Sequence, residues 1–308
     1  MFGSPDCFIG TLDGVIGTLD GVLGPLDGGG SSIGWVEIAG KVAVVTGGGA
    51  GIGAALAKAL AAAGVSVLVA DLNAPAADAV AEEIIATHPG RAIAMGGDVS
   101  DPEVLEAMID RAAAELGPVE IFFANAGTTA GMGLNTSDAL WEVAVDVNVM
   151  AHVRAARILV PRWLESGGGY FVSTASAAGL LTQIGSATYS VTKHAAVGFA
   201  EWLSVTYGDR GIAVSCLCPM GVETALLREG FETDAPGASV AARAVTESGA
   251  VLRPADVADQ VLAAMEDERF LILPHPEVLD FYRNKGSDYD RWIAGMRRFQ
   301  RHLASDGD

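Results

Sequence analysis

Short apolar runs alternate with Ala-rich stretches across residues 39–273. A strand buried on both faces is a nearly continuous apolar run, and a helix between two such runs returns the chain to the same edge of a parallel sheet. The pattern therefore predicts one α/β domain, in which a doubly wound and mainly parallel sheet is flanked by helices. Seven strands are predicted, at residues 41–46, 65–70, 91–95, 119–124, 170–174, 212–218 and 270–273.

Helices are predicted in the intervals between these strands. The sequence SDPE, from Ser100 to Glu103, has the pattern of a capping box and predicts the start of the helix that follows. After the fourth strand, one long helix is predicted to run to about Trp163. Two further helices are predicted at residues 75–87 and 188–207.

Residues 1–38 form a Gly-rich extension with a near-repeat of seven residues: IGTLDGV at 9–15, IGTLDGV at 16–22 and LGPLDGG at 23–29. On a helix the apolar residues would form one stripe, but the many glycines disfavour a free helix. We therefore expect a segment that is disordered alone and helical when docked. It resembles the short amphipathic tags that route proteins into bacterial microcompartments or other shells. An arm packing on the protein's own oligomer and an unstructured tail are the alternatives.

Residues 274–308 form a tail that is rich in aromatic and charged residues, with a helix predicted from Tyr289 to His302. Its apolar side chains recur at helical spacing, which predicts packing against a neighbouring subunit. A phosphate-binding role for the arginines is the alternative. The apolar residues are Trp292, Ile293, Met296 and Phe299, and the arginines are Arg291, Arg297, Arg298 and Arg301.

The chain has 38 Asp and Glu residues against 19 Lys and Arg, a net charge of −19. No basic field is present to hold phosphates, so neither a nucleic acid nor an anionic membrane surface is expected as a partner. No stretch reaches the uncharged apolar length of a membrane span. The N-terminal stretch lacks the basic residues of a secretory signal, and the first basic residue is Lys41. A cytoplasmic location is therefore predicted.

Three cysteines, Cys7, Cys216 and Cys218, are too few for a disulfide framework. They predict buried, inert thiols in a reducing compartment. Cys216 and Cys218 alternate within the sixth predicted strand, and we expect their side chains to point to opposite faces.

The sequence TGGGAGIG, from Thr46 to Gly53, joins the first predicted strand to the first helix. In this position glycines let the backbone approach a pyrophosphate, and the helix N-terminus supplies free N–H groups. Asp71 ends the second strand, 18 residues after Gly53, where a carboxylate can accept a hydrogen bond from a ribose 2′-OH. No Lys or Arg stands nearby to hold a 2′-phosphate, so NAD is favoured over NADP. A flexible turn and a turn-capping Asp are the alternatives.

Two further strand ends are expected on the same edge of the sheet, Asp98–Val99 after the third strand and Asn125–Ala126–Gly127 after the fourth. The carboxyl ends of parallel strands line the ligand crevice of such folds. Taken singly, each pattern is also typical of an ordinary turn.

Tyr189 and Lys193 stand four residues apart, on one face of a predicted helix. A cation near a phenol lowers the phenol pKa, which allows the phenol to accept a proton from an alcohol. Ser176, just past the fifth strand, is placed to polarise a carbonyl. Asn148 lies in an apolar stretch and needs a hydrogen-bond partner if buried. A surface Tyr–Lys pair and a satisfied core Asn are the alternatives.

Together these motifs resemble the short-chain dehydrogenase/reductase family, over residues 39–273. The resemblance implies a Rossmann-type fold, NAD as cofactor, a homotetramer and the catalytic residues Asn148, Ser176, Tyr189 and Lys193. It also implies that Asn148 holds a water linked to Lys193. Met220 stands where the family usually has Gly. The implied cofactor-binding residues are Gly47, Gly51, Ile52, Gly53, Asp71, Asp98, Val99, Asn125, Ala126, Gly127, Tyr189, Lys193, Pro219, Val222 and Thr224.

The predicted function is the NAD-dependent interconversion of a small secondary alcohol and its ketone. An amino alcohol is one option for the substrate, with Glu223 or Glu229 receiving its amino group. The alternatives are a non-catalytic NAD sensor and a scaffold recruited to a shell protein through residues 9–29.

Overall fold

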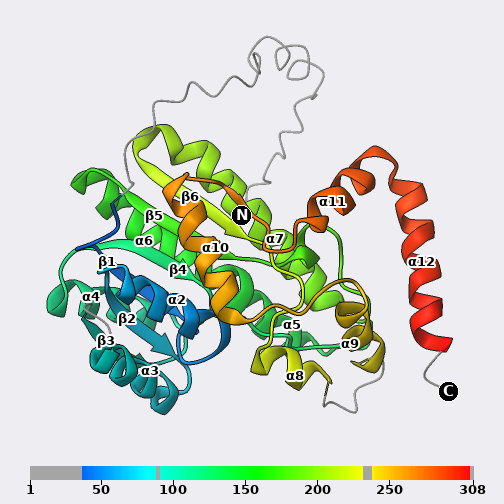
Figure 1. Ribbon diagram of the computed structural model, residues 1–308, viewed down its shortest axis with the longest axis horizontal. Coiled ribbons are helices and arrows are strands. Elements are labelled where there is room, and N and C mark those ends of the chain that lie inside the picture. Colours follow the sequence, from blue (N-terminus) through cyan, green and yellow to red (C-terminus); the bar gives the residue numbers. More distant parts are fainter. Residues whose placement is uncertain (1–36, 88–90, 232–237, 306–308) are drawn as a thin grey trace, which may run out of the picture. The chain divides into compact units, whose positions relative to one another are not determined.

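The computed structural model describes residues 37–87, 91–231 and 238–305. Its seven-stranded sheet has the order β3-β2-β1-β4-β5-β6-β7, and each neighbouring pair is parallel. Strands β2 and β3 are added on one side of β1, and strands β4 to β7 are added on its other side, as in doubly wound folds. The predicted fold class is therefore confirmed (Figure 1). The strands are β1 (Val42–Thr46), β2 (Ser66–Asp71), β3 (Ala92–Gly96), β4 (Val119–Ala124), β5 (Gly169–Thr174), β6 (Ile212–Leu217) and β7 (Leu271–Ile272).

Each face of the sheet is covered by helices. Val44 and Val45 are both fully buried, yet they belong to different hydrophobic clusters. Successive side chains of a strand point to opposite faces, so one continuous apolar run supplies both cores. One face packs against α2 (Gly51–Ala62), α3 (Ala74–Thr87) and α10 (Pro254–Glu266), and the other against α4 (Pro102–Glu115), α6 (Ala151–Ser166) and α7 (Ala187–Tyr207).

The helix after β3 begins one residue later than the capping-box pattern predicts. Its N-cap is Asp101, whose carboxylate accepts hydrogen bonds from the backbone N–H groups of Glu103 and Val104 at 2.9 and 3.5 Å. The prediction that Ser100 caps the helix is wrong because Pro102 occupies the first helical position, which moves the cap to the residue before it.

The long helix predicted after β4 is interrupted. It consists of α5 (Asp138–Val145), a π-helical turn at Asp146–Met150 and α6. A π-helical turn inserts one extra residue into the helix and often marks a functional site. Asn148 lies in the middle of this turn.

Cys216 and Cys218 are both fully buried, and their Sγ atoms lie 3.8 Å apart. The prediction that they point to opposite faces of β6 is wrong, because residues two apart on a strand share a face. The prediction that these two thiols are buried is confirmed.

The C-terminal part of the chain adds α8 (Ala225–Phe231), α9 (Ala238–Thr246), α11 (Glu277–Ser287) and α12 (Tyr289–Ser305). The predicted C-terminal helix is confirmed and continues to Ser305. Helices α11 and α12 are drawn in orange-red in Figure 1, on the side of the domain where α9 lies. The near-repeat at 9–29 lies outside the described residues.

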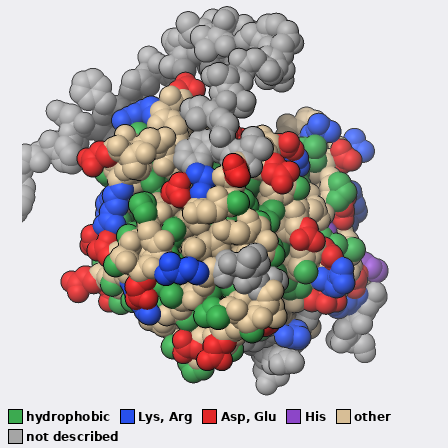
Figure 2. All heavy atoms as spheres, turned by 60° about the vertical axis from the view of Figure 1, so that its left-hand side comes forward, with side chains coloured by type: hydrophobic (Ala, Val, Ile, Leu, Met, Phe, Trp, Pro, Cys, Tyr) green, Lys and Arg blue, Asp and Glu red, His purple; other side chains and the backbone are tan. Residues whose placement is uncertain are grey.

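Acidic and basic side chains are interspersed on the face drawn in Figure 2. This face shows no continuous basic surface, in keeping with the excess of acidic residues. Among the helices in the described part of the chain, none is both long and apolar enough to cross a membrane.

Candidate active site

The carboxyl ends of five strands meet at one cavity of about 960 Å³. Ser176 lines this cavity, but Asn148, Asp98 and Val99 do not. The predicted residues that line it are Gly47, Gly51, Ile52, Gly53, Asp71, Asn125, Ala126, Gly127, Ser176, Tyr189, Lys193, Pro219, Val222 and Thr224. Residues from distant parts of the sequence are brought together because parallel strands end at the same edge of a sheet.

The glycine loop packs too closely to carry side chains. A Cβ atom on Gly53 would lie 2.0 Å from the carbonyl oxygen of Gly47, and Gly47 has a positive φ of 62°. The loop leads into α2, whose N-cap Ala50 makes no side-chain hydrogen bond and whose first turn has no acidic residue. The N–H groups at the start of α2 are thus available to an anion, and the cradle fits a pyrophosphate.

Asp71 connects the end of β2 to this loop. One carboxylate oxygen accepts a hydrogen bond from the Gly49 N–H and the other from the Asn73 N–H, both at 2.9 Å. These bonds hold the carboxylate at the cavity wall, where it can also accept from a ribose hydroxyl. Asp71 thus caps the turn after β2, as the alternative interpretation of the sequence had it, and it also fixes the glycine loop.

Asp98 and Val99 have local roles in the structure. The Asp98 carboxylate accepts a hydrogen bond from the Ser100 N–H at 2.8 Å, and Val99 is 7% exposed and packs in the core. Neither side chain lines the cavity, so their implied contact with the cofactor stays a prediction.

Asn125 links three strands. Its side-chain N–H donates to the Thr46 carbonyl at 2.9 Å, and its side-chain carbonyl accepts from the Thr174 hydroxyl at 3.1 Å. The Thr46 hydroxyl also accepts from the Asn125 backbone N–H at 2.9 Å. These bonds fix the ends of β1, β4 and β5 around the cavity, and the two threonines were not anticipated from the sequence.

Tyr189, Lys193 and Ser176 all line the cavity. Tyr189 and Lys193 lie on successive turns of α7, and the Lys193 Nζ donates a hydrogen bond to the Thr174 carbonyl at 3.0 Å. Ser176 caps a short 3₁₀ turn at the end of β5, and its hydroxyl lies 3.4 Å from the Pro219 carbonyl. The predicted trio is thus held by the helix and by two strand ends.

The pKa shifts of Tyr189 and Lys193 differ from the prediction that a nearby cation lowers the pKa of the phenol. Burial raises the pKa of the Tyr189 phenol, and hydrogen bonding to Ser176 opposes that rise. Burial also lowers the pKa of Lys193, to about 8. The net shift of the Tyr189 pKa is upward, so the lowering predicted from the nearby Lys193 cation is not observed. For both groups, burial away from water is the largest cause of the pKa shift.

Asn148 is fully buried and fully hydrogen-bonded. Its carbonyl accepts from the Thr128 N–H at 2.8 Å, and its N–H₂ group donates to the Thr128 carbonyl at 2.9 Å and to the Thr192 hydroxyl at 3.0 Å. A Cβ on Gly127 would lie 3.3 Å from the Asn148 carbonyl oxygen and 3.4 Å from the Lys193 Nζ. Asn148 thus joins the segment after β4 to α7, behind the cavity wall.

The segment after β6, which contains Met220, is held by hydrogen bonds to and from His275. The Met220 N–H donates to the His275 Nδ1 at 3.1 Å, and the His275 Nε2 lies 3.0 Å from the Ala250 carbonyl. Val222 bridges to Leu252 in parallel fashion. His275 is 2% exposed, and sequence reasoning missed its part in holding this loop.

His152 is buried on the other side of Lys193. Its Nδ1 lies 2.9 Å from the Ser173 hydroxyl, and its Nε2 has no hydrogen-bond partner among the described residues. Burial, and secondarily the charge on Lys193, lowers the pKa of His152 to about 3. The imidazole is therefore neutral near pH 7.

The outer part of the cavity is apolar. Sequence reasoning assigned the apolar residues of the C-terminal helix to a subunit contact, but three of them line the cavity: Trp292, Met296 and Phe299. The neighbouring helices contribute Leu226, Leu227, Val245 and Phe281. Only their tertiary placement shows that these residues belong to the site.

Residues 41–235 match the model of the short chain dehydrogenase family. The chain belongs to the short-chain dehydrogenase family. It is thus an oxidoreductase, and the family resemblance predicted from the sequence motifs is confirmed. The matched segment of this short-chain dehydrogenase begins at β1 and ends after α8, so α9 to α12 lie beyond it.

Relatives of this short-chain dehydrogenase include enzymes named for cyclic alcohols. Cyclohexanol dehydrogenase of Acinetobacter sp. (strain SE19) is 35% identical over 63% of this chain and 78% of its own length. The 1-deoxy-11-beta-hydroxypentalenate dehydrogenase of Streptomyces exfoliatus is 32% identical over 82% of this chain and 90% of its own length. A short-chain dehydrogenase/reductase of Burkholderia phymatum, solved in complex with NAD, has a TM-score of 0.75 and 31% identity, over 82% of this chain and 95% of that one.

Proposed function

We propose that this protein interconverts a cyclic secondary alcohol and its ketone, with NAD as the redox cofactor. The observation that carries the proposal is the placement of Tyr189, Ser176 and Lys193 in one cavity with the glycine loop and Asp71. When bound, NAD supplies the acceptor for the hydride that leaves the carbinol carbon.

The glycine loop and the start of α2 would hold the pyrophosphate of NAD, and Asp71 would accept from its ribose hydroxyls. A carboxylate at this position repels a 2′-phosphate, which favours NAD over NADP. The 31% identical structure from Burkholderia phymatum in complex with NAD supports this choice of cofactor.

In oxidation, the Tyr189 phenolate would accept the proton of the alcohol hydroxyl. The Ser176 hydroxyl, next to it, would hold the substrate oxygen through a hydrogen bond. A protonated Lys193 favours the phenolate electrostatically and, by the family resemblance, contacts the nicotinamide ribose. By the family resemblance, Asn148 would hold a water that links Lys193 to a proton relay. In reduction, the same phenol returns the proton to the carbonyl oxygen.

An apolar cyclic substrate fits the cavity better than an amino alcohol. Glu223 is exposed and does not line the cavity, and the side chain of Glu229 lies outside the described residues. The cavity wall includes Glu247, but this carboxylate pairs with Arg243 at 2.8 Å. The names of the cyclohexanol and pentalenate relatives point to the same class.

The test is an NAD reduction screen with purified full-length protein, over cyclohexanol, bicyclic alcohols, acyclic diols and amino alcohols. Formation of NADH with the cyclic alcohols, and little with the amino alcohols, is expected. Tight NAD binding without turnover of any alcohol would instead favour the non-catalytic sensor.

We also propose that the protein works as a homo-oligomer, with the homotetramer of the family as the expected form. Helices α5 and α7 pack together and expose apolar side chains on their outer faces. Val191, Trp202 and Val205 share one side of α7 and are 54%, 54% and 87% exposed. Burying such a patch against a second copy would remove it from water.

A cytoplasmic location stays a proposal based on the cysteine usage and on the lack of a secretory-signal pattern. Recruitment to a microcompartment shell through residues 9–29 stays a proposal based on the repeat. Its test is deletion of residues 1–38. Loss of co-purification with shell proteins, with unchanged activity, would support it.

A further inference from the structure

Helix α12 forms part of the cavity wall, and it follows, in the sequence, the segment that is matched to the family. Trp292, Met296 and Phe299 are four and three residues apart, so they share one face of this helix. We call these three side chains the α12 wall. Ile293 points elsewhere on the same helix and is 43% exposed.

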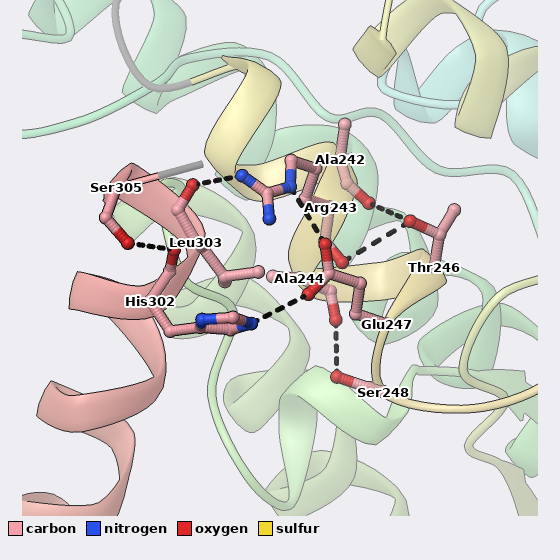
Figure 3. A network of polar contacts seen from close by, with 9 residues as sticks. All are labelled: Ala242, Arg243, Ala244, Thr246, Glu247, Ser248, His302, Leu303 and Ser305. Atoms are coloured by element: carbon pink, nitrogen blue, oxygen red, sulfur yellow. Dashed lines mark hydrogen bonds and ion pairs between the residues drawn. The ribbon is translucent and has the colours of Figure 1, made fainter. Parts of the chain in front are cut away.

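The α12 wall is held in place by contacts with α9 of the same chain. Leu303 is 1% exposed and packs with Ile184 and Ala244. The Arg243 guanidinium donates to the Leu303 carbonyl at 2.6 Å and to the Glu247 carboxylate at 2.8 Å (Figure 3). His302 lies 3.8 Å from the other oxygen of Glu247. One polar network thus ties the end of α12 to α9.

Several polar side chains of this outer region have their hydrogen bonds within the protein, but the Trp292 Nε1–H is buried and has no hydrogen-bond partner among the described residues. The Gln183 amide donates to the carbonyls of Ile184 and Ala241, at 3.2 and 3.3 Å. The Ser248 hydroxyl donates to the Ala244 carbonyl, and Glu247 is paired with Arg243. A ligand in this part of the cavity therefore meets mainly apolar surface, which favours an apolar ligand group.

We propose that the α12 wall selects alcohols in which the carbinol ring carries a second apolar ring. The inference rests on the proposed function, since it places the reacting carbon at Tyr189 and the second ring at the α12 wall. Each methylene that leaves water raises affinity about fourfold, so even partial burial of a second ring produces a strong preference.

Cyclohexanol and trans-4-cyclohexylcyclohexanol are a matched pair of probes, because they differ only in the second ring. With the full chain and NAD, we expect kcat/KM for the two-ring alcohol to exceed that for cyclohexanol by at least about tenfold. Phe299→Ala should lower kcat/KM for the two-ring alcohol by a factor about tenfold larger than the factor by which it lowers kcat/KM for cyclohexanol. Ile293→Ala is the matched control and should change neither.

Met296→Trp tests the same idea without removing packing. The larger side chain would fill the outer cavity and lower kcat/KM for the two-ring alcohol by a much larger factor than kcat/KM for cyclohexanol. Equal effects of Phe299→Ala on both alcohols, or an effect on neither, would overturn the proposal. A change in oligomeric state without a change in this preference would also overturn it and would make the α12 wall a contact between subunits.

Direct binding separates this inference from the proposed function. If neither alcohol is oxidised, the proposed function fails, and calorimetric titration of the protein with trans-4-cyclohexylcyclohexanol still tests the α12 wall. Binding that is about tenfold weaker in Phe299→Ala than in Ile293→Ala would support it. Equal affinities in these two variants, or undetectable binding to the unaltered protein, would overturn it.

Discussion

The Nζ atom of Lys193 lies 5.6 Å from the centroid of the Tyr189 ring, one helical turn away on α7. The ammonium lies beside the aromatic ring and donates its hydrogen bond to the Thr174 carbonyl. The helix and the end of β5 therefore fix the distance between the two groups before any ligand enters. Both groups are shielded from water, so the pKa of each is sensitive to any charge that is added nearby.

Tyr189→Phe should remove the proton acceptor and keep the shape of the cavity. We expect kcat to fall by about 10²- to 10⁴-fold, the usual contribution of general acid–base catalysis. NAD affinity, measured by calorimetric titration, should change little. Retention of most of the activity would show that another group moves the proton.

Asp71→Ala should weaken NAD binding and relax discrimination against NADP. The variant loses the acceptor for the ribose hydroxyls and the negative charge that would repel a 2′-phosphate. The quantity to measure is the ratio of kcat/KM for NAD to that for NADP, because loss of the hydrogen bond to Gly49 affects both cofactors. An unchanged ratio would contradict the ribose contact.

Lys193→Met should stabilise the protein at pH 7 while impairing catalysis. Burial lowers the pKa of Lys193 to about 8 in the folded protein, so the unfolded chain holds its proton more tightly. Folding with a charged Lys193 thus costs about 3 kcal/mol below pH 8. The cost falls as the pH rises above about 8 and vanishes above the unfolded pKa. Denaturant unfolding of both proteins from neutral to alkaline pH measures the difference, and a constant difference would contradict the buried charge.

His152 should make the protein sensitive to acid. Its pKa in the folded state is about 3, below the unfolded value of 6.5, so the unfolded state binds a proton that the folded state rejects. The contribution of neutral His152 is complete above pH 6.5 and is lost as the pH falls toward 3, by up to roughly 5 kcal/mol. His152→Gln should show a shallower fall in unfolding free energy over this interval. If the unfolding free energies of the two proteins fell in parallel with decreasing pH, the lowered pKa of His152 would be contradicted.

Val205→Glu should disrupt the proposed oligomer. Val205 is 87% exposed on α7, so a charge there costs little in the isolated chain but would be buried in an interface. We expect light scattering to show a smaller species with an unchanged circular dichroism spectrum. Val205→Ala is the control and should leave the mass unchanged.

The local patterns were sufficient to predict the sheet. Each predicted strand ends within one residue of the observed strand, because a fully buried parallel strand is a continuous apolar run with clear limits. The glycine loop, Asp71 and the Tyr189–Lys193 pair were also found by spacing within single elements. These residues line one cavity because the parallel strands that precede them end at the same edge of the sheet.

Other features depend on contacts between distant elements. The π-helical turn around Asn148 is stabilised by partners after β4 and on α7, which no helical periodicity reveals. The apolar face of α12 shows that the helix must be covered, but an amphipathic pattern does not specify by what. Only the tertiary structure places that face on the cavity, because α12 is held by contacts such as the hydrogen bond from Arg243 to the Leu303 carbonyl, 60 residues away in sequence. The sequence by itself thus determined the sheet and the chemistry at its edge, and the packing of the last helices decided the shape of the site.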